Sequence, residues 1–449
     1  MAVTEHPGDL SDLLRRAREV LDANWRGSFS VPALRQYPYQ WSWDSAFIAI
    51  GYAHFDQHRA EEELRALFAA QWADGRVPHI VFHEADPAAP YFPGPAFWQI
   101  ERSPHAPSTH YTTGIVQPPV HATAVLHIHD HAADPQRALA YVAEMFPKLC
   151  AWHDFLYRER DPLDEGLVYI VHPWESGQDN SPLWDPVLAR MALRPEQIPP
   201  YQRADTRAVD PSERPLNADY DCYIYLVDFF RQRAYDEGRI YREGCPFLVQ
   251  DVLFNTLLCR AEQDMAELAE LIGADPAPFR ARAARTAAAI DAKLWDEDRG
   301  YYADYDLGAG AAIPVPALAG FSPMFAGVPD AERAARMVGY LGSDAFWLGP
   351  DPEGGFPASS YDRFAPGYSP RRYWRGPVWI HMNWLMMHGL SAYGYAEQAG
   401  RLRSAIIDLP RVGDFREYFN PETGTGHGAE VFSWTAALLI DVLSGDQVT

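Results

Sequence analysis

The sequence contains almost no lysine. Only Lys148 and Lys293 occur among the 449 residues, and neither belongs to the GxxxxGK[ST] pattern that holds a nucleotide phosphate. A P-loop is therefore excluded, and Schiff-base chemistry is disfavoured because it requires a lysine amine. The chain has 38 Lys and Arg against 61 Asp and Glu, a formal net charge of −23. Such an acidic protein repels phosphate backbones, so we expect no nucleic-acid partner.

Cysteine and long apolar runs are also scarce. The four cysteines, Cys150, Cys222, Cys245 and Cys259, form no CxxC pair, which disfavours a zinc framework or a thioredoxin-type motif and predicts reduced thiols. No apolar run approaches the roughly 18 residues of a membrane-spanning helix. The first twelve or so residues lack the basic and apolar regions of a secretory signal. We therefore expect a cytoplasmic protein with no membrane association.

Several common catalytic and metal-binding motifs are missing. The chain has no GxSxG nucleophile elbow, no HExxH motif and no complete GxGxxG loop. His127 and His131 in the sequence HIHDH would share one face of a helix, a spacing that can bind metal. No matching third ligand accompanies them in the sequence. We therefore expect a solvated or packed face there, with no metal site and no cofactor.

Helical periodicity dominates the chain, and strand patterns are few. Short strands are expected at 168–171 and 300–305. Because no βαβ alternation runs through the chain, doubly wound and TIM-barrel folds are disfavoured. Amphipathic or capped segments predict about twelve helices. They are expected at 10–24, 43–54, 58–74, 118–132, 135–158, 218–236, 247–272, 275–296, 330–341, 376–394, 396–408 and 429–444.

Long connections rich in proline and aromatic residues separate these helices. They span 75–117, 172–217, 298–329 and 342–375. Loops of this length in a compact domain are usually functional. Helices that alternate with such loops predict an all-α fold, an (α/α)6 barrel whose loops form a lidded active-site pocket at one end. No linker divides the chain, so we expect a single catalytic domain over residues 1–449.

Four segments place aromatic side chains beside charged or polar ones. They are 37–45 (YPYQWSWDS), 172–181 (HPWESGQDNS), 373–384 (YWRGPVWIHMNW) and 415–435, which contains FREYFNP, GTGHG and FSWT. Cleavage of a glycosidic bond requires two carboxyl groups, one of which stays protonated near neutral pH beside an apolar wall. The chain has 14 Trp and 24 Tyr, side chains that supply such walls and stack on sugar faces.

Taken in this order, the four segments resemble the signature of glycoside hydrolase family 63 and of the neighbouring trehalase family. The resemblance rests on WDSAF, a Trp and Glu before G-x-D, YWRGPVW, and E-Y-x-x-P-x-T-G followed by W-T, within residues 37–435. It implies the (α/α)6 barrel. Within the family the chain is similar to short bacterial hydrolases of glucosylglycerate and mannosylglycerate, which lack the β-sandwich domain of larger members.

The resemblance further implies an inverting α-glycosidase with two catalytic carboxyl groups. Asp179 of the G-x-D loop would be the general acid, and Glu417 would be the general base that activates a water. Inversion requires carboxyl groups about 6.5–9.5 Å apart, whereas retention requires about 5–5.5 Å. Glu430 remains an alternative base, and Glu175 remains an alternative acid.

Substrate-binding residues are expected around these carboxyl groups. The resemblance implies that Asp44 holds sugar hydroxyls, with capping of its helix as the alternative. Tyr91, Gln117 and Gly177 are further candidate contacts. For aromatic candidates, packing in the core is the alternative. The wall of the sugar site is expected to include Tyr37, Trp41, Trp374, Trp379 and Trp434.

A glycerate group carries a carboxylate, which an acidic protein must bind beside a local cation. The candidates are Arg203, Arg207 and Arg214 in the second long loop and Arg375 in the YWRG segment, with surface ion pairs as the alternative. Arg207 is the first choice, because its proline-rich loop could close over the pocket.

Glucosylglycerate is the first-choice substrate and mannosylglycerate the second. One alternative is a trehalase- or glucoamylase-like α-glucosidase that acts on a neutral disaccharide, and another is a sugar-binding protein without catalysis. The expected partner is thus a small glycoside, and a homo-oligomer remains open.

Overall fold

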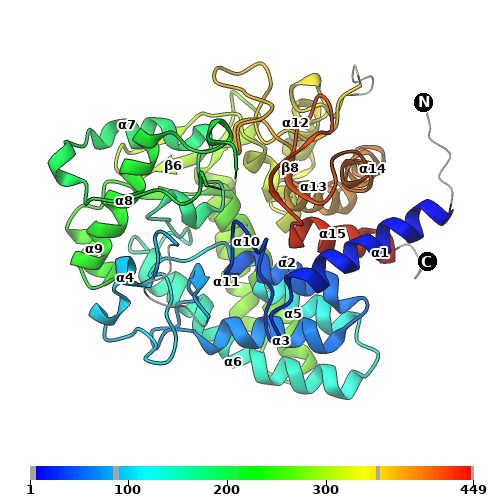
Figure 1. The fold of residues 1–449 in the computed structure, drawn as a ribbon, viewed down its shortest axis with the longest axis horizontal. Coiled ribbons are helices and arrows are strands. Elements are labelled where there is room, and N and C mark those ends of the chain that lie inside the picture. The colour runs from blue at the N-terminus through cyan, green and yellow to red at the C-terminus, as the bar shows by residue number, and fades with distance from the viewer. Residues whose placement is uncertain (1–6, 84–90, 208, 350–353, 446–449) are drawn as a thin grey trace.

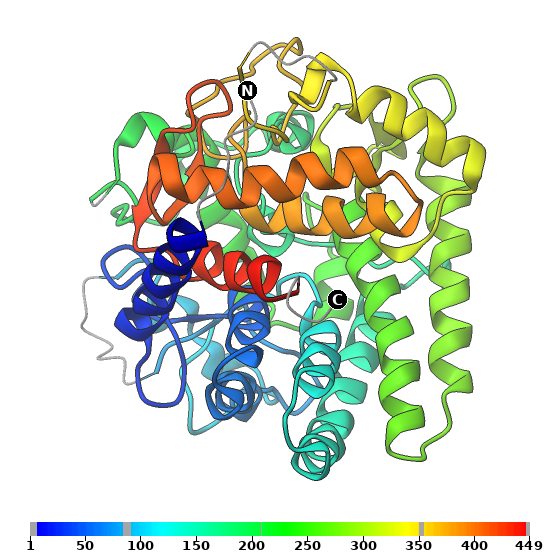
Figure 2. The ribbon, with the colours of Figure 1, turned by 90° about the vertical axis from the view of Figure 1, so that its right-hand side faces the viewer.

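Six helical segments pack side by side in a closed ring at the centre of the molecule (Figures 1 and 2). The computed structural model describes residues 7–83, 91–207, 209–349 and 354–445. Around the ring come α2 (Ser42–Ala53), α5 (His121–Asp130), α10 (Val252–Leu271), the 3-10 segment η6 (Leu318–Ala326), α13 (Ile380–Ala392) and α15 (Ser433–Ser444). Because α15 packs on α2, the ring is closed.

Each inner segment packs against one outer helix. In the same order, the outer helices are α3 (Gln57–Ala69), α6 (Pro135–Arg160), α11 (Ala277–Lys293), α12 (Ala331–Leu341), α14 (Ala396–Gly413) and α1 (Pro7–Asn24). Burial distinguishes the two layers: every residue of α2 is buried, whereas α11 buries only the stripe Phe279, Ala283, Thr286 and Ile290. Within the described residues, six inner–outer pairs confirm the expected (α/α)6 barrel.

Local signals set where several helices begin. Asp134 accepts hydrogen bonds from the backbone amides of Gln136 and Arg137, and Pro135 occupies the first helical position of α6. Asp330 caps α12 in the same way. These caps satisfy amide groups that have no partner within the helix, which is why the expected start points at 135 and 330 agree with the structure to within a residue.

One position of the ring differs from the expectation. The helix expected at 218–236 is present as α8 (Asn217–Gln232), but it packs with α7 (Asp185–Met191) in the long excursion between α6 and α10 (Figure 1). The inner position between α10 and α13 belongs instead to η6, inside the segment 298–329 that was expected to be a loop. Pro323 weakens the helical pattern of η6, yet all nine of its residues are buried, so tertiary packing outweighs local propensity.

In the described part of the chain, the strands are short and pair antiparallel in four small sheets. They are β1 (Gln40–Trp41) with β2 (Ile80–Val81), β3 (Val249–Gln250) with β6 (Asp304–Asp306) and β7 (Ala311–Ile313), β4 (Trp295–Asp296) with β5 (Tyr301–Tyr302), and β8 (Arg416–Phe419) with β9 (Gly426–Glu430). The strand expected at 300–305 appears as β5 and β6. The one expected at 168–171 is wrong, because Ile170 makes only an isolated bridge to Val249.

The hairpin of β8 and β9 shortens the last expected helix. Tyr418 pairs with His427, and the register shifts between Arg416 and Tyr418. Because β9 occupies residues that were expected to start the helix at 429, α15 begins only at Ser433. The segment that carries Glu417 is therefore a strand rather than a loop.

Short helices and loops collect at one end of the barrel. Besides α7 and α8, they include α4 (Pro95–Trp98) and α9 (Glu237–Arg242). Asp44, Trp379 and Trp434 lie near the N-termini of α2, α13 and α15, and all three line one pocket. These inner helices therefore begin at the same end of the barrel. None of the described helices is both long enough and apolar enough to cross a membrane. The four cysteines are free.

Candidate active site

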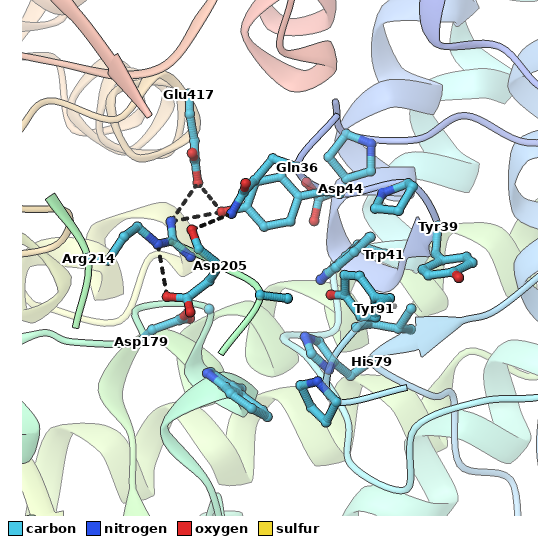
Figure 3. A pocket seen from close by; sticks show the side chains of 18 of the residues that line it. Gln36, Tyr39, Trp41, Asp44, His79, Tyr91, Asp179, Asp205, Arg214 and Glu417 are labelled. Carbon is cyan, nitrogen blue, oxygen red and sulfur yellow. Dashed lines mark hydrogen bonds and ion pairs between the residues drawn. The ribbon is translucent and has the colours of Figure 1, made fainter. Parts of the chain in front are cut away.

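A pocket of about 340 Å³ opens where the inner helices begin (Figure 3). Pockets of this size suit small-molecule ligands. Aromatic side chains form the largest group in its wall, and charged side chains such as Asp44, Asp179, Arg214 and Glu417 also line it. The aromatic rings in the lining include those of Tyr37, Trp41, Trp43, Tyr91, Trp98, Trp174, Tyr220, Tyr373, Trp379 and Trp434.

Glu417 enters this pocket from strand β8. Its side chain is buried, Tyr37 Oη donates a hydrogen bond to Oε1 over 2.8 Å, and the amide of Ala429 donates to Oε2 over 2.9 Å. Burial raises the pKa of Glu417, while Arg214 and these donors act in the opposite direction. Gly428 makes the arrangement possible: its φ is +68°, and a Cβ there would lie 2.4 Å from Glu417 Oε2.

Asp179 reaches the pocket from the loop that follows the 3-10 segment η2 (Pro173–Ser176). That segment ends at Gly177, where φ is +73° and a Cβ would lie 2.2 Å from the ring of Trp43. Glycine therefore lets the loop press against the aromatic wall. Burial raises the pKa of Asp179 to about 7, and the negative charge of Glu417 adds to this rise while Arg214 opposes it.

Arg214 lies between the two carboxyl groups (Figure 3). Its Nη1 donates to Tyr37 Oη over 2.9 Å and lies 3.9 Å from Glu417 Oε1, and its Nε is 3.4 Å from Asp205 Oδ2. The guanidinium stands over the ring of Tyr373 at 4.2 Å. A buried cation with these contacts stabilises negative charge at the centre of the pocket.

Comparisons with known proteins show the family to which the chain belongs. Residues 37–435 match the family described as the mannosylglycerate hydrolase MGH1-like glycoside hydrolase domain. The chain belongs to this family of glycoside hydrolases. A mannosylglycerate hydrolase of Rubrobacter radiotolerans is 54% identical over 97% of both chains, and a glucosylglycerate hydrolase of Mycolicibacterium hassiacum is 37% identical over 96% of this chain and 98% of that protein.

A solved structure supports the same assignment. The crystal structure of a mannosylglycerate hydrolase of glycoside hydrolase family 63 from Thermus thermophilus, in complex with Tris and D-glycerate, superposes with a TM-score of 0.88. It is 45% identical and covers 96% of this chain and 99% of that one. The resemblance inferred from the four segments is thus confirmed, and this hydrolase has the fold of its family.

In this hydrolase, Asp44 lies in the first turn of α2 with its side chain buried. The N-cap of α2 is Trp41, so the capping alternative for Asp44 does not hold. Burial raises the pKa of Asp44 well above its usual range, and the charges of Glu417 and Glu63 raise it further. Gln117, whose Oε1 accepts a hydrogen bond from the amide of Trp43 over 3.2 Å, supports the start of the same helix and also lines the pocket.

The structure separates the expected sugar wall into two layers. Tyr37, Trp41, Trp379 and Trp434 line the pocket, as do Tyr91 and Gly177. Trp374 is absent from the lining. Its ring stacks on Trp379 with centroids 4.1 Å apart and planes within 6°. Trp374 therefore supports the wall from behind Trp379, and its contact with a sugar stays a prediction.

The four candidate arginines fall into two groups, those that line the pocket and those that do not. Arg207 is exposed in the lining, and Arg214 is buried in it. Arg203 holds Asp205 with two hydrogen bonds of 3.0 and 2.7 Å and does not line the pocket. Arg375 also lies outside the lining, where it pairs with Asp185. The contact of Arg375 with the substrate stays a prediction.

The two alternative catalytic carboxyl groups are not in the pocket lining. Glu175 is fully buried in an ion pair with Arg160 at 2.8 Å and accepts hydrogen bonds from the amides of Val116 and Val171. Glu430 is exposed and pairs with Arg416 at 3.0 Å. Glu175 thus ties loops together inside the fold, and Glu430 points to solvent.

Three pocket residues carried no signal in the sequence. Arg35 stands two positions before Tyr37 and is exposed in the lining. His79 is nearly parallel to the ring of Trp174, with centroids 6.3 Å apart, and burial lowers its pKa to about 3. Asp205 holds Arg214 in place. None of the three belongs to one of the four segments: Arg35 lies just before the first, and only the folding of distant loops brings His79 and Asp205 to the pocket.

Proposed function

We propose that this glycoside hydrolase cleaves mannosylglycerate or glucosylglycerate into the hexose and glycerate, with inversion at the anomeric carbon. The observation that carries the proposal is the pair Asp179 and Glu417, set in one aromatic pocket on either side of Arg214. The two carboxyl groups have different surroundings, which suits the two different roles in glycoside hydrolysis.

In the proposed reaction, Asp179 is the general acid. A carboxyl group with a pKa of about 7 holds a proton near neutral pH and can give it to the glycosidic oxygen as the bond to the anomeric carbon breaks. The proton leaves with the glycerate. After the reaction Asp179 carries the negative charge, which Arg214 stabilises.

Glu417 is the proposed general base. Three groups favour its ionised form: the hydroxyl of Tyr37, the amide of Ala429 and the guanidinium of Arg214. It would accept a proton from a water that attacks the anomeric carbon on the face opposite the leaving group. The new C–O bond then forms with inverted configuration.

The exposed cations of the pocket are the proposed site for the glycerate carboxylate. Arg35 and Arg207 both line the pocket as exposed side chains. Arg214 also lines it, but it is buried and contacts Tyr37, Asp205 and Glu417. An anion entering a protein with a net charge of −23 needs such local donors. The D-glycerate complex of the Thermus thermophilus relative is consistent with this assignment.

The relatives change the order of the two substrates. The sequence placed glucosylglycerate first, but the mannosylglycerate hydrolase of Rubrobacter radiotolerans is 54% identical and the glucosylglycerate hydrolase is 37% identical. We therefore place mannosylglycerate first. The two sugars differ in one hydroxyl group, and the residue beside it decides the preference.

A substrate panel with product analysis tests the proposal. The purified protein is incubated with mannosylglycerate, glucosylglycerate, trehalose and methyl α-mannoside, and proton NMR follows the first sugar anomer released. We expect β-hexose from the two α-linked glycerates and slower release from the neutral glycosides. Release of the α-anomer would overturn inversion, and equal rates on trehalose would overturn the glycerate assignment.

A further inference from the structure

The C-terminal ends of three inner helices meet at the end of the barrel opposite the pocket. His54 caps the C-terminus of α2, His131 caps that of α5, and His127 lies in the last turn of α5. Asp441 lies in the last turn of α15. The ligand atoms of the three histidines all lie within 4.8 Å of one another. The sequence revealed only two of these histidines, because His54 precedes His127 by 73 positions.

Two of the histidine nitrogens and one oxygen of Asp441 form a close triangle. His54 Nε2 is 2.7 Å from Asp441 Oδ1, His127 Nε2 is 2.9 Å from the same oxygen, and the two nitrogens are 3.2 Å apart. An ionised carboxylate only accepts hydrogen bonds, so each nitrogen must donate to it. The contact between the nitrogens then joins two donors. Hydrogen bonds therefore account for the two contacts to Asp441 but not for the one between the nitrogens.

A single metal ion would account for all three contacts at once, including the one between the nitrogens. Zinc binds histidine nitrogen and carboxylate oxygen at about 2.0–2.2 Å, so neighbouring ligand atoms of a tetrahedral site lie about 3.3 Å apart. The distance of 3.2 Å between the two nitrogens is close to this value, whereas Asp441 Oδ1, at 2.7 and 2.9 Å, would move outward by about half an ångström. The ring of His131 is centred 4.1 Å from that of His127 and 4.3 Å from that of His54, near enough to supply a fourth ligand.

Neighbouring groups orient two of these ligands. His131 Nδ1 donates to the backbone carbonyl of His127 over 2.9 Å, which leaves Nε2 as the free lone pair. Trp384 Nε1 donates to Asp441 Oδ2 over 2.7 Å, which leaves Oδ1 for the site. Metal-binding histidines and carboxylates are usually held by such second hydrogen bonds.

Charge and access also favour a cation. The ends of α2, α5 and α15 present the negative end of the helix dipole. The side chains of His54 and Asp441 are 6% and 9% exposed, and that of His127 is 20% exposed, which leaves a path from solvent.

We propose that His54, His127, His131 and Asp441 bind one Zn²⁺ ion in a tetrahedral site that joins the ends of α2, α5 and α15. This replaces the expectation of a packed or solvated histidine face without metal. Four protein ligands leave no open position for a reacting water, as in structural zinc sites. Helix α2 has 12 residues, about 18 Å, and separates the site from Asp44 in the pocket.

A zinc titration tests the site. The tag-free protein is treated with a chelator, dialysed and titrated with ZnCl₂ by calorimetry, and metal content is measured by elemental analysis. We expect one zinc per chain with a Kd below about 10 µM and, at a 100-fold excess over Kd, a rise in Tm of about 3 °C. A Kd above about 10 µM, or no rise in Tm, would overturn the proposal.

Matched histidine variants locate the binding. His127→Gln and His131→Gln each remove one ligand, and we expect at least a tenfold weaker Kd in both. His131 lies at the end of its helix, so His131→Gln tests the site even if His127→Gln folds poorly. His129→Gln is the control, because His129 lies on the same helix and contacts Asp130.

Cobalt adds a readout that a structural role would not change. Bound Co²⁺ in a tetrahedral site has intense visible bands, and we expect them in the wild-type protein and in His129→Gln but not in His131→Gln. Unchanged bands in His131→Gln, or zinc binding that His129→Gln weakens equally, would show that these residues do not form the site.

Discussion

The pocket and the opposite end of the barrel both contain a carboxyl group that is largely withdrawn from solvent, but the two groups differ in their partners. In the pocket, burial raises the pKa of Asp179 to about 7, and the charge of Glu417 adds to the rise. At the opposite end, burial also raises the pKa of Asp441, but hydrogen bonds from His127 and His54 outweigh it and hold the pKa well below its usual range. Trp384 adds a third donor.

The difference shows that the donors around a buried carboxyl group decide the sign of its pKa shift. At the end with Asp441, the donors are supplied by the protein, and the ionised carboxylate stabilises the fold. In the pocket, burial and the neighbouring charge of Glu417 raise the pKa values of Asp44 and Asp179.

The largest expected effect follows from neutralising the pocket carboxyl groups. Glu417→Gln and Asp179→Asn should each lower kcat for mannosylglycerate at least about 10³-fold, because each removes a proton-transfer group. Circular dichroism should show an intact fold. Glu430→Gln is the control on the same hairpin, because Glu430 is exposed and pairs with Arg416. An equal loss in that variant would remove the distinction between the two glutamates.

Replacing the exposed arginines of the pocket should have a smaller effect on activity. Arg207→Gln and Arg35→Gln should raise KM for mannosylglycerate about tenfold each, because a charge-assisted contact to the carboxylate is lost. Steady-state kinetics on methyl α-mannoside provide the comparison. If KM rises equally on this neutral substrate, the two arginines do not bind the glycerate group.

The pH dependence of kcat/KM tests the proposed role of Asp179 as general acid. Because Asp179 must be protonated to act and burial raises its pKa to about 7, kcat/KM should fall about tenfold per pH unit above pH 7. Rates are measured between pH 5 and 9 in buffers of constant ionic strength. A profile that stays flat to pH 9 would contradict the role of Asp179.

Asp441 should stabilise the fold in a pH-dependent way. Because its pKa is lowered by His127 and His54, its contribution is present above the pKa of the unfolded state, about 3.9, and is lost as the pH falls below it. Asp441→Asn should therefore lower the free energy of unfolding by about 2–4 kcal/mol at pH 7. Denaturation is measured with chelator present, so that the result does not depend on bound metal. An unchanged unfolding midpoint in Asp441→Asn would contradict the stabilising role of Asp441.

Replacing Asp179 should change the free energy of unfolding in the opposite direction to replacing Asp441, and by the smallest amount. Its raised pKa stabilises the protonated native state below the unfolded pKa, and that contribution is lost as the pH rises through about 7. Asp179→Asn resembles the protonated form, so it should raise the free energy of unfolding by about 1–2 kcal/mol at pH 8 and by less at pH 5. A lower stability at pH 8 would mean that Asp179 is held ionised.

Much of the fold could be predicted because its signals are local. Asp134 and Pro135 mark the start of α6 in the sequence itself, and the stripe that contains Phe279 and Ile290 marks the buried face of α11. The helices expected from such signals are present. The segment η6 was missed because Pro323 breaks its local pattern, although its neighbours bury it completely.

The sequence by itself determined the helices of the barrel other than η6, the order of the four aromatic segments and the resemblance that singled out Asp179 and Glu417. Only the tertiary structure decided that Trp379 lines the pocket while Trp374 supports it, that Arg375 pairs with Asp185, and that His54 joins His127. Periodicity and capping depend on neighbours within a few residues. Contacts between residues tens to hundreds of positions apart arise only when the ring of helices closes.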